Sequence, residues 1–95
     1  MLDVGRIRNR DLKRLVANGD ESGIRGDWRG KVRRILGALN VATHPEELNL
    51  PGMKWHELRG DRKGTYSCVV SKNWRITYRW DADGPLDVDL EDYHG

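Results

Sequence analysis

The stretch Trp74-Arg75-Ile76-Thr77-Tyr78-Arg79-Trp80 decides the fold of this chain. Its large apolar side chains alternate with polar ones, which is the period of a β-strand that buries one face. A turn-forming segment, Asp81-Ala82-Asp83-Gly84-Pro85, follows, and residues 86–91 then alternate in the same way. The pattern predicts a β-hairpin whose first strand turns Arg75 and Arg79 away from the core.

A simple register for this hairpin places Arg79 opposite Asp87 and Arg75 opposite Glu91. Tyr93 continues the same outward row. The outward face of the sheet would then be polar, charged and shallow, which suits an RNA strand. A second reading stays open, in which the two arginines do no more than pair with the acidic last strand.

Working back from the hairpin, the period of two also covers residues 53–58 and 65–70, so two further strands are expected there. The loop Arg59-Gly60-Asp61-Arg62-Lys63-Gly64 joins them. At the N-terminus, residues 4–7 have only a weak β pattern. The expected sheet therefore lies almost entirely in the second half of the chain.

The first half of the chain predicts two helices. In residues 9–18 the apolar side chains recur at helical spacing, and Gly19 is a natural C-terminal stop. Asp27 is the expected N-cap of a second helix, which ends near residues 40–43 because the following His-Pro pair disfavours continuation. Five apolar residues of this helix form one stripe: Trp28, Val32, Ile35, Leu36 and Leu39.

Helices followed by strands predict an α+β fold, with two N-terminal helices packed on one face of a small antiparallel sheet of three to five strands. A chain of 95 residues is expected to form one domain, residues 1–95. The chain has no Phe, so Trp and Tyr must supply the large core side chains. Trp28, Trp74 and Trp80 are expected in the core, and Trp55 is undecided.

The net charge is only +2, but the charge is unevenly distributed. Residues 81–92 contain six acidic side chains and no basic one, whereas residues 1–40 and 54–79 are rich in Lys and Arg. This asymmetry suggests an anionic partner, with nucleic acid the first candidate. Neutralisation between neighbouring strands explains it equally well.

The one cysteine, Cys68, allows no intramolecular disulfide, and no Cys-x-x-Cys pair suggests a zinc site. We expect Cys68 to be buried in its strand, and we expect neither a metal nor a cofactor. The N-terminal residues do not resemble a signal peptide, and no apolar run approaches the ~20 residues that would cross a bilayer. A cytoplasmic protein without a membrane contact is the economical interpretation.

Three histidines are the candidates for proton transfer, because an imidazole titrates near neutral pH. His44 precedes a proline in a connection and is expected to be an exposed loop residue. His56 lies in a predicted strand, where a single histidine is more often packed or superficial than catalytic. His94 is penultimate, where a side chain is ordinarily frayed. Taken alone, neither His56 nor His94 establishes a site.

Three segments favour a catalytic role for His56 and His94. They are Arg59-Gly60-Asp61-Arg62-Lys63-Gly64-Thr65-Tyr66-Ser67, the strand from Asn73 to Trp80, and the closing Asp92-Tyr93-His94. In order and spacing they resemble the HigB toxins, a branch of the RelE-type superfamily of bacterial toxins. The family pattern has a Leu-His-x-Leu-Lys-Gly segment, an Asn-Trp-Arg-Ile-x-Phe strand and a final Asp-Tyr-His. The resemblance covers nearly the whole chain, and its second half is the more specific.

This resemblance implies a RelE-like fold and a toxin that binds the ribosome, cleaves mRNA in the A site and is neutralised by a HigA-like helix-turn-helix antitoxin. It implies that His56 and His94 transfer protons and that Arg75 stabilises the phosphate. It also implies that Tyr93 stacks on or orients the nucleotide, while Asp92 orients a histidine or helps in proton transfer. Contacts with RNA or the ribosome are expected from Lys54, Arg59, Arg62, Lys63, Asn73 and Arg79.

Three alternatives remain at this point. The basic loop side chains are, in the plainer reading, solvated charges, and Asn73 is equally suited to a turn. ParE-like toxins share the fold but inhibit gyrase through protein contact. The third alternative is a nucleic-acid-binding module without catalysis. The closing Asp-Tyr-His and the internal His56 favour the nuclease, since an inhibitor has no evident need for them.

Overall fold

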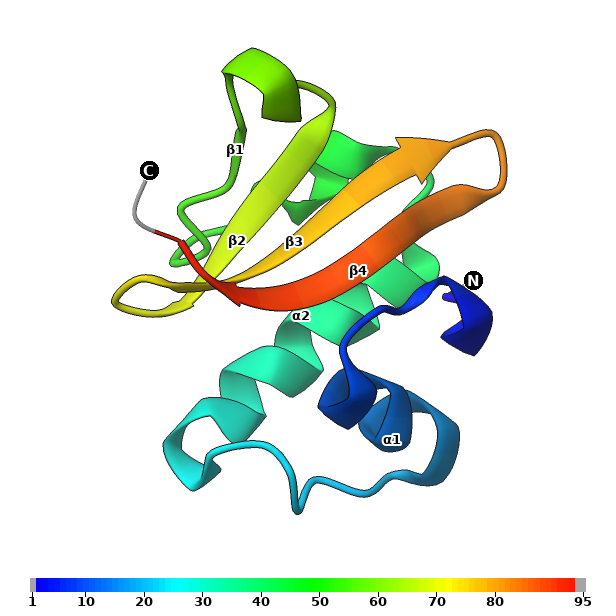
Figure 1. The fold of residues 1–95 in the computed structure, drawn as a ribbon, viewed down its shortest axis with the longest axis vertical. Helices are drawn as coiled ribbons and strands as arrows, with labels where there is room; N and C mark the ends of the chain where they lie inside the picture. Colours follow the sequence, from blue (N-terminus) through cyan, green and yellow to red (C-terminus); the bar gives the residue numbers. More distant parts are fainter. Residues whose placement is uncertain (1, 94–95) are drawn as a thin grey trace.

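A computed structural model describes residues 2–93 of the chain. Its first half contains the helices α1 (Arg10–Asn18) and α2 (Arg29–Val41). Its second half contains the four-stranded antiparallel sheet β1 (His56–Glu57), β2 (Thr65–Ser71), β3 (Trp74–Asp81) and β4 (Gly84–Asp92). The strand order follows the chain order, and α2 runs behind the sheet in Figure 1. The predicted α+β architecture, with helices on one face of a small antiparallel sheet, is confirmed.

Helix α1 has the predicted boundaries because both of its ends are capped by local chemistry. The side chain of Asn9 accepts a hydrogen bond from the Leu12 backbone N–H at 2.9 Å. At the other end Gly19 adopts the left-handed conformation, with φ of 70°. Leu12 is fully buried, whereas Leu15 and Val16 pack against the edge of the core.

Helix α2 buries four of the five residues of the predicted stripe, all but Trp28, and begins differently from the prediction. Val32, Ile35, Leu36 and Leu39 are buried. Asp27, however, is not the N-cap, because it lies inside a 3-10 turn (Gly26–Trp28) and its carboxylate accepts from Arg25 Nε at 2.8 Å. The turn supplies the first hydrogen bonds of the helix, so Trp28 takes the cap position without a side-chain cap.

The strand expected over residues 53–58 is shorter than predicted. Lys54 adopts a left-handed conformation, with φ of 47°, and only His56 and Glu57 pair with β2. Residues 4–7 form no strand either. Val4–Arg6 is a 3-10 turn, after which Ile7 makes a single parallel bridge to Val88.

The β3–β4 hairpin has the predicted partners at one end and not at the other. Arg75 lies opposite Glu91, as expected, but Arg79 lies opposite Leu86 rather than Asp87. The cause is a β-bulge, in which two residues of β4 face one residue of β3 between Thr77 and Arg79. Asp87 has a φ of 51°, a left-handed conformation that aspartate tolerates better than most residues.

The core lies between the helices and one sheet face, and aromatic side chains extend it along the strands. Trp55, Tyr66, Tyr78 and Trp80 form a ladder of ring contacts with centroids 5.5–6.2 Å apart. Tyr78 is fully buried, donates to the Pro45 carbonyl at 2.7 Å and accepts from Trp55 Nε1 at 2.8 Å. The expectation that Trp74 belongs to the core is wrong: its side chain is 36% exposed at the start of β3, where it contacts the partly buried Trp28.

Cys68 lies fully buried in β2, as expected, and burial raises the pKa of its thiol to about 12. No helix within residues 2–93 is long and apolar enough to cross a membrane. The sheet face away from the helices, which we call the open face, stays free of helical cover (Figure 1). It carries the side chains that the sequence singled out for chemistry.

Candidate active site

His56 stands on the open face at the edge of the sheet. It pairs with Ser67 across β1 and β2, and its imidazole is exposed. Nδ1 of the ring lies 3.3 Å from the carbonyl oxygen of Lys54 and 3.5 Å from Oγ of the fully buried Ser67. The left-handed backbone of Lys54 turns that carbonyl towards the ring. These contacts hold the imidazole by its Nδ1 edge.

A shallow hollow of about 320 Å³ lies beside His56. Its lining residues come from β1, from the loop after it and from the position that follows β4: His56, Glu57, Leu58, Arg59 and Tyr93. The hollow brings together an imidazole, a guanidinium and a phenol, although Tyr93 is 37 positions along the chain from His56. These are the side-chain types that proton transfer and phosphate binding require.

Tyr93 is held from two directions. Its backbone N–H donates to the carbonyl oxygen of Asn73 at 2.8 Å, which ties the end of β4 to the β2–β3 turn. The Cζ atoms of Arg62 and Arg75 lie 5.9 and 5.8 Å from the centroid of its ring. At these distances both guanidinium groups attract the ring quadrupole, so Tyr93 links the two cations.

Arg75, on the open face, has buried hydrogen-bond donors that lack an acceptor among the described residues. Its side chain is half-buried, and Nε and Nη1 are shielded from solvent with no hydrogen-bond partner among residues 2–93. A buried guanidinium donor without an acceptor is costly, and in native proteins such a group calls for an explanation. A bound phosphate would supply an acceptor to this guanidinium.

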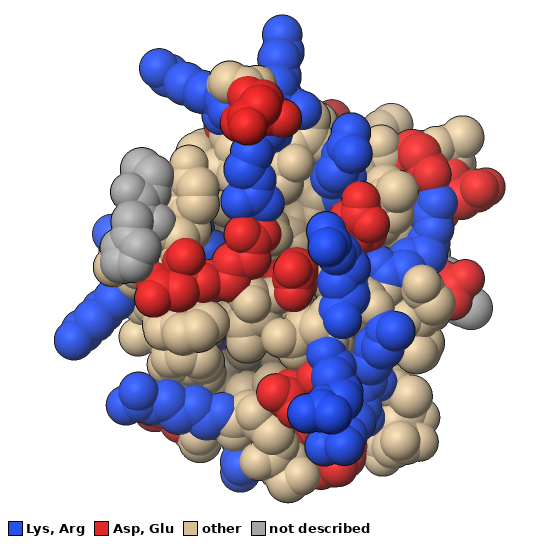
Figure 2. All heavy atoms as spheres, in the orientation of Figure 1, with Lys and Arg blue, Asp and Glu red and all other residues tan. Residues whose placement is uncertain are grey.

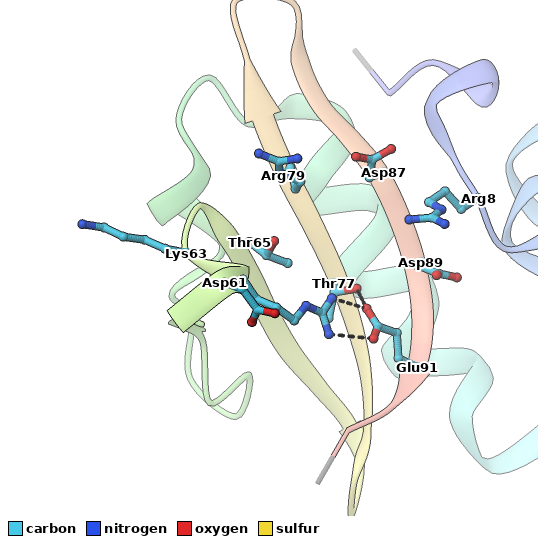
Figure 3. Close-up of a pocket in the computed structure, with 10 residues that line it drawn as sticks. Arg8, Asp61, Lys63, Thr65, Thr77, Arg79, Asp87, Asp89 and Glu91 are labelled. Atoms are coloured by element: carbon cyan, nitrogen blue, oxygen red, sulfur yellow. Dashed lines mark hydrogen bonds and ion pairs between the residues drawn. The ribbon is translucent and has the colours of Figure 1, made fainter. Parts of the chain in front are cut away.

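Glu91, which faces Arg75 in the register, binds Arg62 instead. Its two carboxylate oxygens accept from Arg62 Nη1 and Nη2 at 2.9 and 2.7 Å, and one of them also accepts from the Thr77 hydroxyl. Figure 3 marks the contact between Glu91 and the Thr77 hydroxyl with a dashed line. The hydrogen bonds from Arg62 lower the pKa of Glu91, and the pairing raises the pKa of Arg62.

A second hollow, of about 230 Å³, occupies the middle of the open face. It is lined by Arg8, Asp61, Arg62, Lys63, Thr65, Thr77, Arg79, Asp87, Asp89 and Glu91 (Figure 3). Its four basic and four acidic side chains balance each other, and Figure 2 shows this mixture of charges over the sheet. The open face is therefore polar and charged, as predicted, without being uniformly basic.

The structure separates the predicted site residues into groups. His56, Arg59 and Tyr93 share the hollow at the sheet edge, and Arg62 and Arg75 contact the Tyr93 ring. The side chains of the remaining residues do not line this hollow. Arg79 and Lys63 line the central hollow, Lys54 is exposed before β1, Asn73 is in the β2–β3 turn and Asp92 is the exposed last residue of β4, opposite Trp74. His94 lies outside the described residues.

Sequence reasoning missed two side chains that shape this site, Ser67 and Thr77, and it placed Glu91 opposite Arg75 without indicating that Glu91 binds Arg62. Ser67 contacts His56, Thr77 donates to Glu91, and Glu91 anchors Arg62. The alternation along β3 does place Thr77 on the same face as Arg75. No pattern in the sequence indicates which of two arginines a carboxylate will bind, because that choice depends on where the loop after β1 folds. Within residues 2–93 no cluster of three His, Cys, Asp or Glu side chains suggests a metal site.

Comparison with known protein sequences places the chain in a family. The sequence profile of the RelE-like toxins of the type II toxin–antitoxin system HigB matches residues 6–94. The chain is also 36% identical, over 88 residues, to a protein named endoribonuclease HigB from Proteus vulgaris, an alignment that covers 93% of this chain and 96% of the relative. The chain therefore belongs to the HigB family of RelE-like toxins of type II toxin–antitoxin systems.

Proposed function

We propose that this toxin is an endoribonuclease that cuts mRNA in the A site of the ribosome and thereby stops translation. The Proteus vulgaris relative, similar over nearly its whole length, is named an endoribonuclease. The observation that carries the proposal is Arg75, whose two buried donors have no partner among residues 2–93 and whose guanidinium contacts Tyr93, at the hollow that His56 lines. A phosphate group at this position would give the Arg75 guanidinium an acceptor.

The proposed chemistry is attack by the ribose 2′-OH on the neighbouring phosphate. His56 and His94 exchange the protons, one taking a proton from the 2′-OH and the other giving one to the leaving 5′-oxygen. Arg75 stabilises the additional negative charge on the phosphate as the attack proceeds. Tyr93 stacks on the nucleotide or orients it, and Asp92 orients a histidine. No metal or cofactor takes part in this scheme.

The proposed docking surface consists of the remaining predicted residues: Lys54, Arg59, Lys63, Asn73 and Arg79, with Arg62 beside them. These side chains would contact ribosomal RNA phosphates, so that the ribosome supplies the alignment of the substrate. Such an arrangement suits a shallow site, because a hollow of about 320 Å³ does not enclose an RNA strand. The protein would work in the cytoplasm and be held inactive there by an antitoxin of the helix-turn-helix HigA type.

Primer extension on a defined mRNA in purified translation tests the proposal. The lanes compare wild type, His94→Ala and Arg75→Ala, with and without ribosomes. We expect cuts that need both the ribosome and His94, and a loss of about a hundredfold or more in rate for Arg75→Ala. Arg34→Ala is the matched control, because Arg34 is an exposed arginine on α2, and it should cut as wild type does.

Co-sedimentation with ribosomes separates catalysis from binding. If Arg75→Ala still pellets with ribosomes but no longer cuts, Arg75 acts on the phosphate. Intact mRNA in every wild-type lane would overturn the nuclease proposal. Cuts of equal rate without ribosomes would overturn only the ribosome dependence.

A further inference from the structure

Glu91 binds one of two neighbouring arginines, and the consequence of this pairing for catalysis rests on the proposed RNA cleavage. Glu91 is the register partner of Arg75, so the Cα atoms of the two residues are only about 4.5–5.5 Å apart. A carboxylate opposite an arginine on one sheet face ordinarily forms a cross-strand ion pair. In this structure both oxygens of Glu91 are bound to Arg62 instead.

Arg62 reaches Glu91 from outside the hairpin. It ends the 3-10 turn Gly60–Arg62, in the loop between β1 and β2, and its guanidinium crosses the open face to form a two-pronged pair with the carboxylate. The Thr77 hydroxyl donates to the same carboxylate. With three donors on its two oxygens and a cation beside it, Glu91 has little left to offer a second guanidinium.

Arg62 and Arg75 both contact the ring of Tyr93 and are therefore close to each other. The Cζ atoms of Arg62 and Arg75 lie at nearly equal distances from its ring, 5.9 and 5.8 Å. The site thus contains two guanidinium groups and one nearby carboxylate. Arg62 is neutralised, while Nε and Nη1 of Arg75 have no acceptor among the described residues.

We propose that Arg62 is a positioning residue: by occupying Glu91 it prevents that carboxylate from pairing with Arg75, and so keeps the Arg75 donors available for the scissile phosphate. Removal of Arg62 would release Glu91 to its register partner. Arg75 would then be neutralised and its donors filled, although no atom that contacts the substrate had been altered. This role differs from the phosphate contact that the loop position of Arg62 suggests.

Double substitution distinguishes the two roles. Arg62→Met keeps the length of the side chain but removes its charge, and it should slow single-turnover cleavage on the ribosome by roughly tenfold to a hundredfold. Adding Glu91→Gln should restore the rate to within about threefold of wild type, because glutamine carries no charge to neutralise Arg75. If Arg62 served as a phosphate contact, the second substitution would not restore the rate.

Asp89→Asn is the matched control for the second substitution. Asp89 is on the same strand and lines the same hollow, but it faces Thr77 rather than Arg75. The Arg62→Met/Asp89→Asn protein should therefore remain as slow as Arg62→Met. Restoration by Asp89→Asn as well as by Glu91→Gln would mean that net charge alone sets the rate, and would overturn the proposal. So would full activity of Arg62→Met, or no recovery with Glu91→Gln.

NMR of the free protein provides a readout that does not need cleavage. The Nε–Hε resonance of Arg75, assigned through Arg75→Lys, should shift downfield and exchange more slowly in Arg62→Met as Glu91 pairs with it. The change should disappear in Arg62→Met/Glu91→Gln. An unchanged resonance in Arg62→Met would overturn the proposal even if wild type cuts mRNA. Absence of cleavage by wild type, with the shift present, would instead count against the proposed function alone.

Discussion

Each charged side chain of the open face has a role that its immediate neighbours decide. Arg75 and Arg62 are chemically identical, yet one has both ends of its guanidinium bound to a carboxylate and the other has donors without a partner among residues 2–93. The difference follows from position, because Arg62 comes from a loop that can reach Glu91 and Arg75 is fixed in a strand. Two residues of the same type can therefore differ in how much of their charge is available to a substrate.

The Arg62–Glu91 pair should make stability depend on pH in the acid range. The folded protein lowers the pKa of Glu91 below its ordinary value of 4.5, so the stabilisation is complete above that pH and is lost as the pH falls through the lowered value. Urea unfolding from about pH 6 to about pH 3 should show wild type losing its advantage over Glu91→Gln. The variant keeps part of the slope, because Asp81 and Glu47 also have lowered pKa values. A difference between the two proteins that does not change with pH would contradict this account.

Cys68 should resist alkylation in the native protein. It is fully buried, and burial raises the pKa of its thiol to about 12, so fewer than about one thiol in a thousand is ionised at pH ~8. Mass spectrometry after treatment with iodoacetamide should show unmodified native protein. The same protein unfolded in urea is the control and should be fully labelled. Rapid labelling of the native protein would mean that β2 opens easily.

At the scale of the elements, local chemistry explains the ends of α1 but not the start of α2. Asn9 and Gly19 cap α1 through their own side chain and backbone conformation. For α2 the preceding 3-10 turn takes over the capping, and Asp27 turns to Arg25. The bulge in β4 is a further case, and it includes Val88, which bridges Ile7 from the N-terminal segment.

Asn9 and Asp27 allow the contribution of helix capping to stability to be compared directly at two positions. Asn9→Ala should lower the free energy of unfolding by about 0.5–2 kcal/mol, because the Leu12 N–H loses its acceptor. Asp27→Ala should have an effect of less than about 0.5 kcal/mol, since its carboxylate only pairs with exposed Arg25. Urea unfolding of both variants checks this. Equal losses would mean that Asp27 supports α2 in a way that its contacts do not show.

The hydroxyl of Tyr78 joins three elements of the fold. Tyr78→Phe would leave Trp55 Nε1 and the Pro45 carbonyl oxygen without a partner, so a loss of about 1–3 kcal/mol is expected in urea unfolding. Tyr66→Phe is the matched control. Its ring belongs to the same ladder, but its hydroxyl makes no hydrogen bond among residues 2–93, and its loss should stay within about 0.5 kcal/mol. Similar losses in both proteins would assign the stability to ring packing alone.

At the scale of the whole molecule, the two faces of the sheet have different roles. The helices cover one face of the sheet and close the core, and the opposite face is left open for Arg75, Tyr93 and the acidic strand β4 (Figures 1 and 2). Because acidic and basic side chains alternate there, the net charge of +2 understates how strongly individual cations can attract phosphate.

Binding to the ribosome should therefore weaken steeply with salt. If the basic loop and strand residues contact RNA phosphates, the logarithm of the association constant falls linearly with the logarithm of the salt concentration. Lys63→Gln should reduce that slope by about one, since one phosphate contact is removed. Sedimentation with ribosomes across a salt series measures both slopes. A flat response of wild type would contradict electrostatic docking.

Much of this architecture follows from the sequence alone. The alternation from Trp74 to Trp80 identifies β3 and the face that carries Arg75, because side chains of a strand point alternately to opposite sides whatever surrounds them. Helical spacing identifies the buried stripe of α2 for the same local reason. The closing motif and the strands before it also suffice to suggest the family, since their order and spacing are properties of the chain itself.

Only the tertiary structure decides which of these residues meet. The meeting of His56 with Tyr93, the bulge that moves Arg79 away from Asp87 and the pairing of Glu91 with Arg62 all join segments that are distant in the chain or differ by a single step in register. A one-residue shift reverses the face of every side chain beyond it, and nothing in a local pattern reports such a shift. For this protein the sequence determines which side chains are offered for chemistry, whereas packing determines which of them are free to perform it.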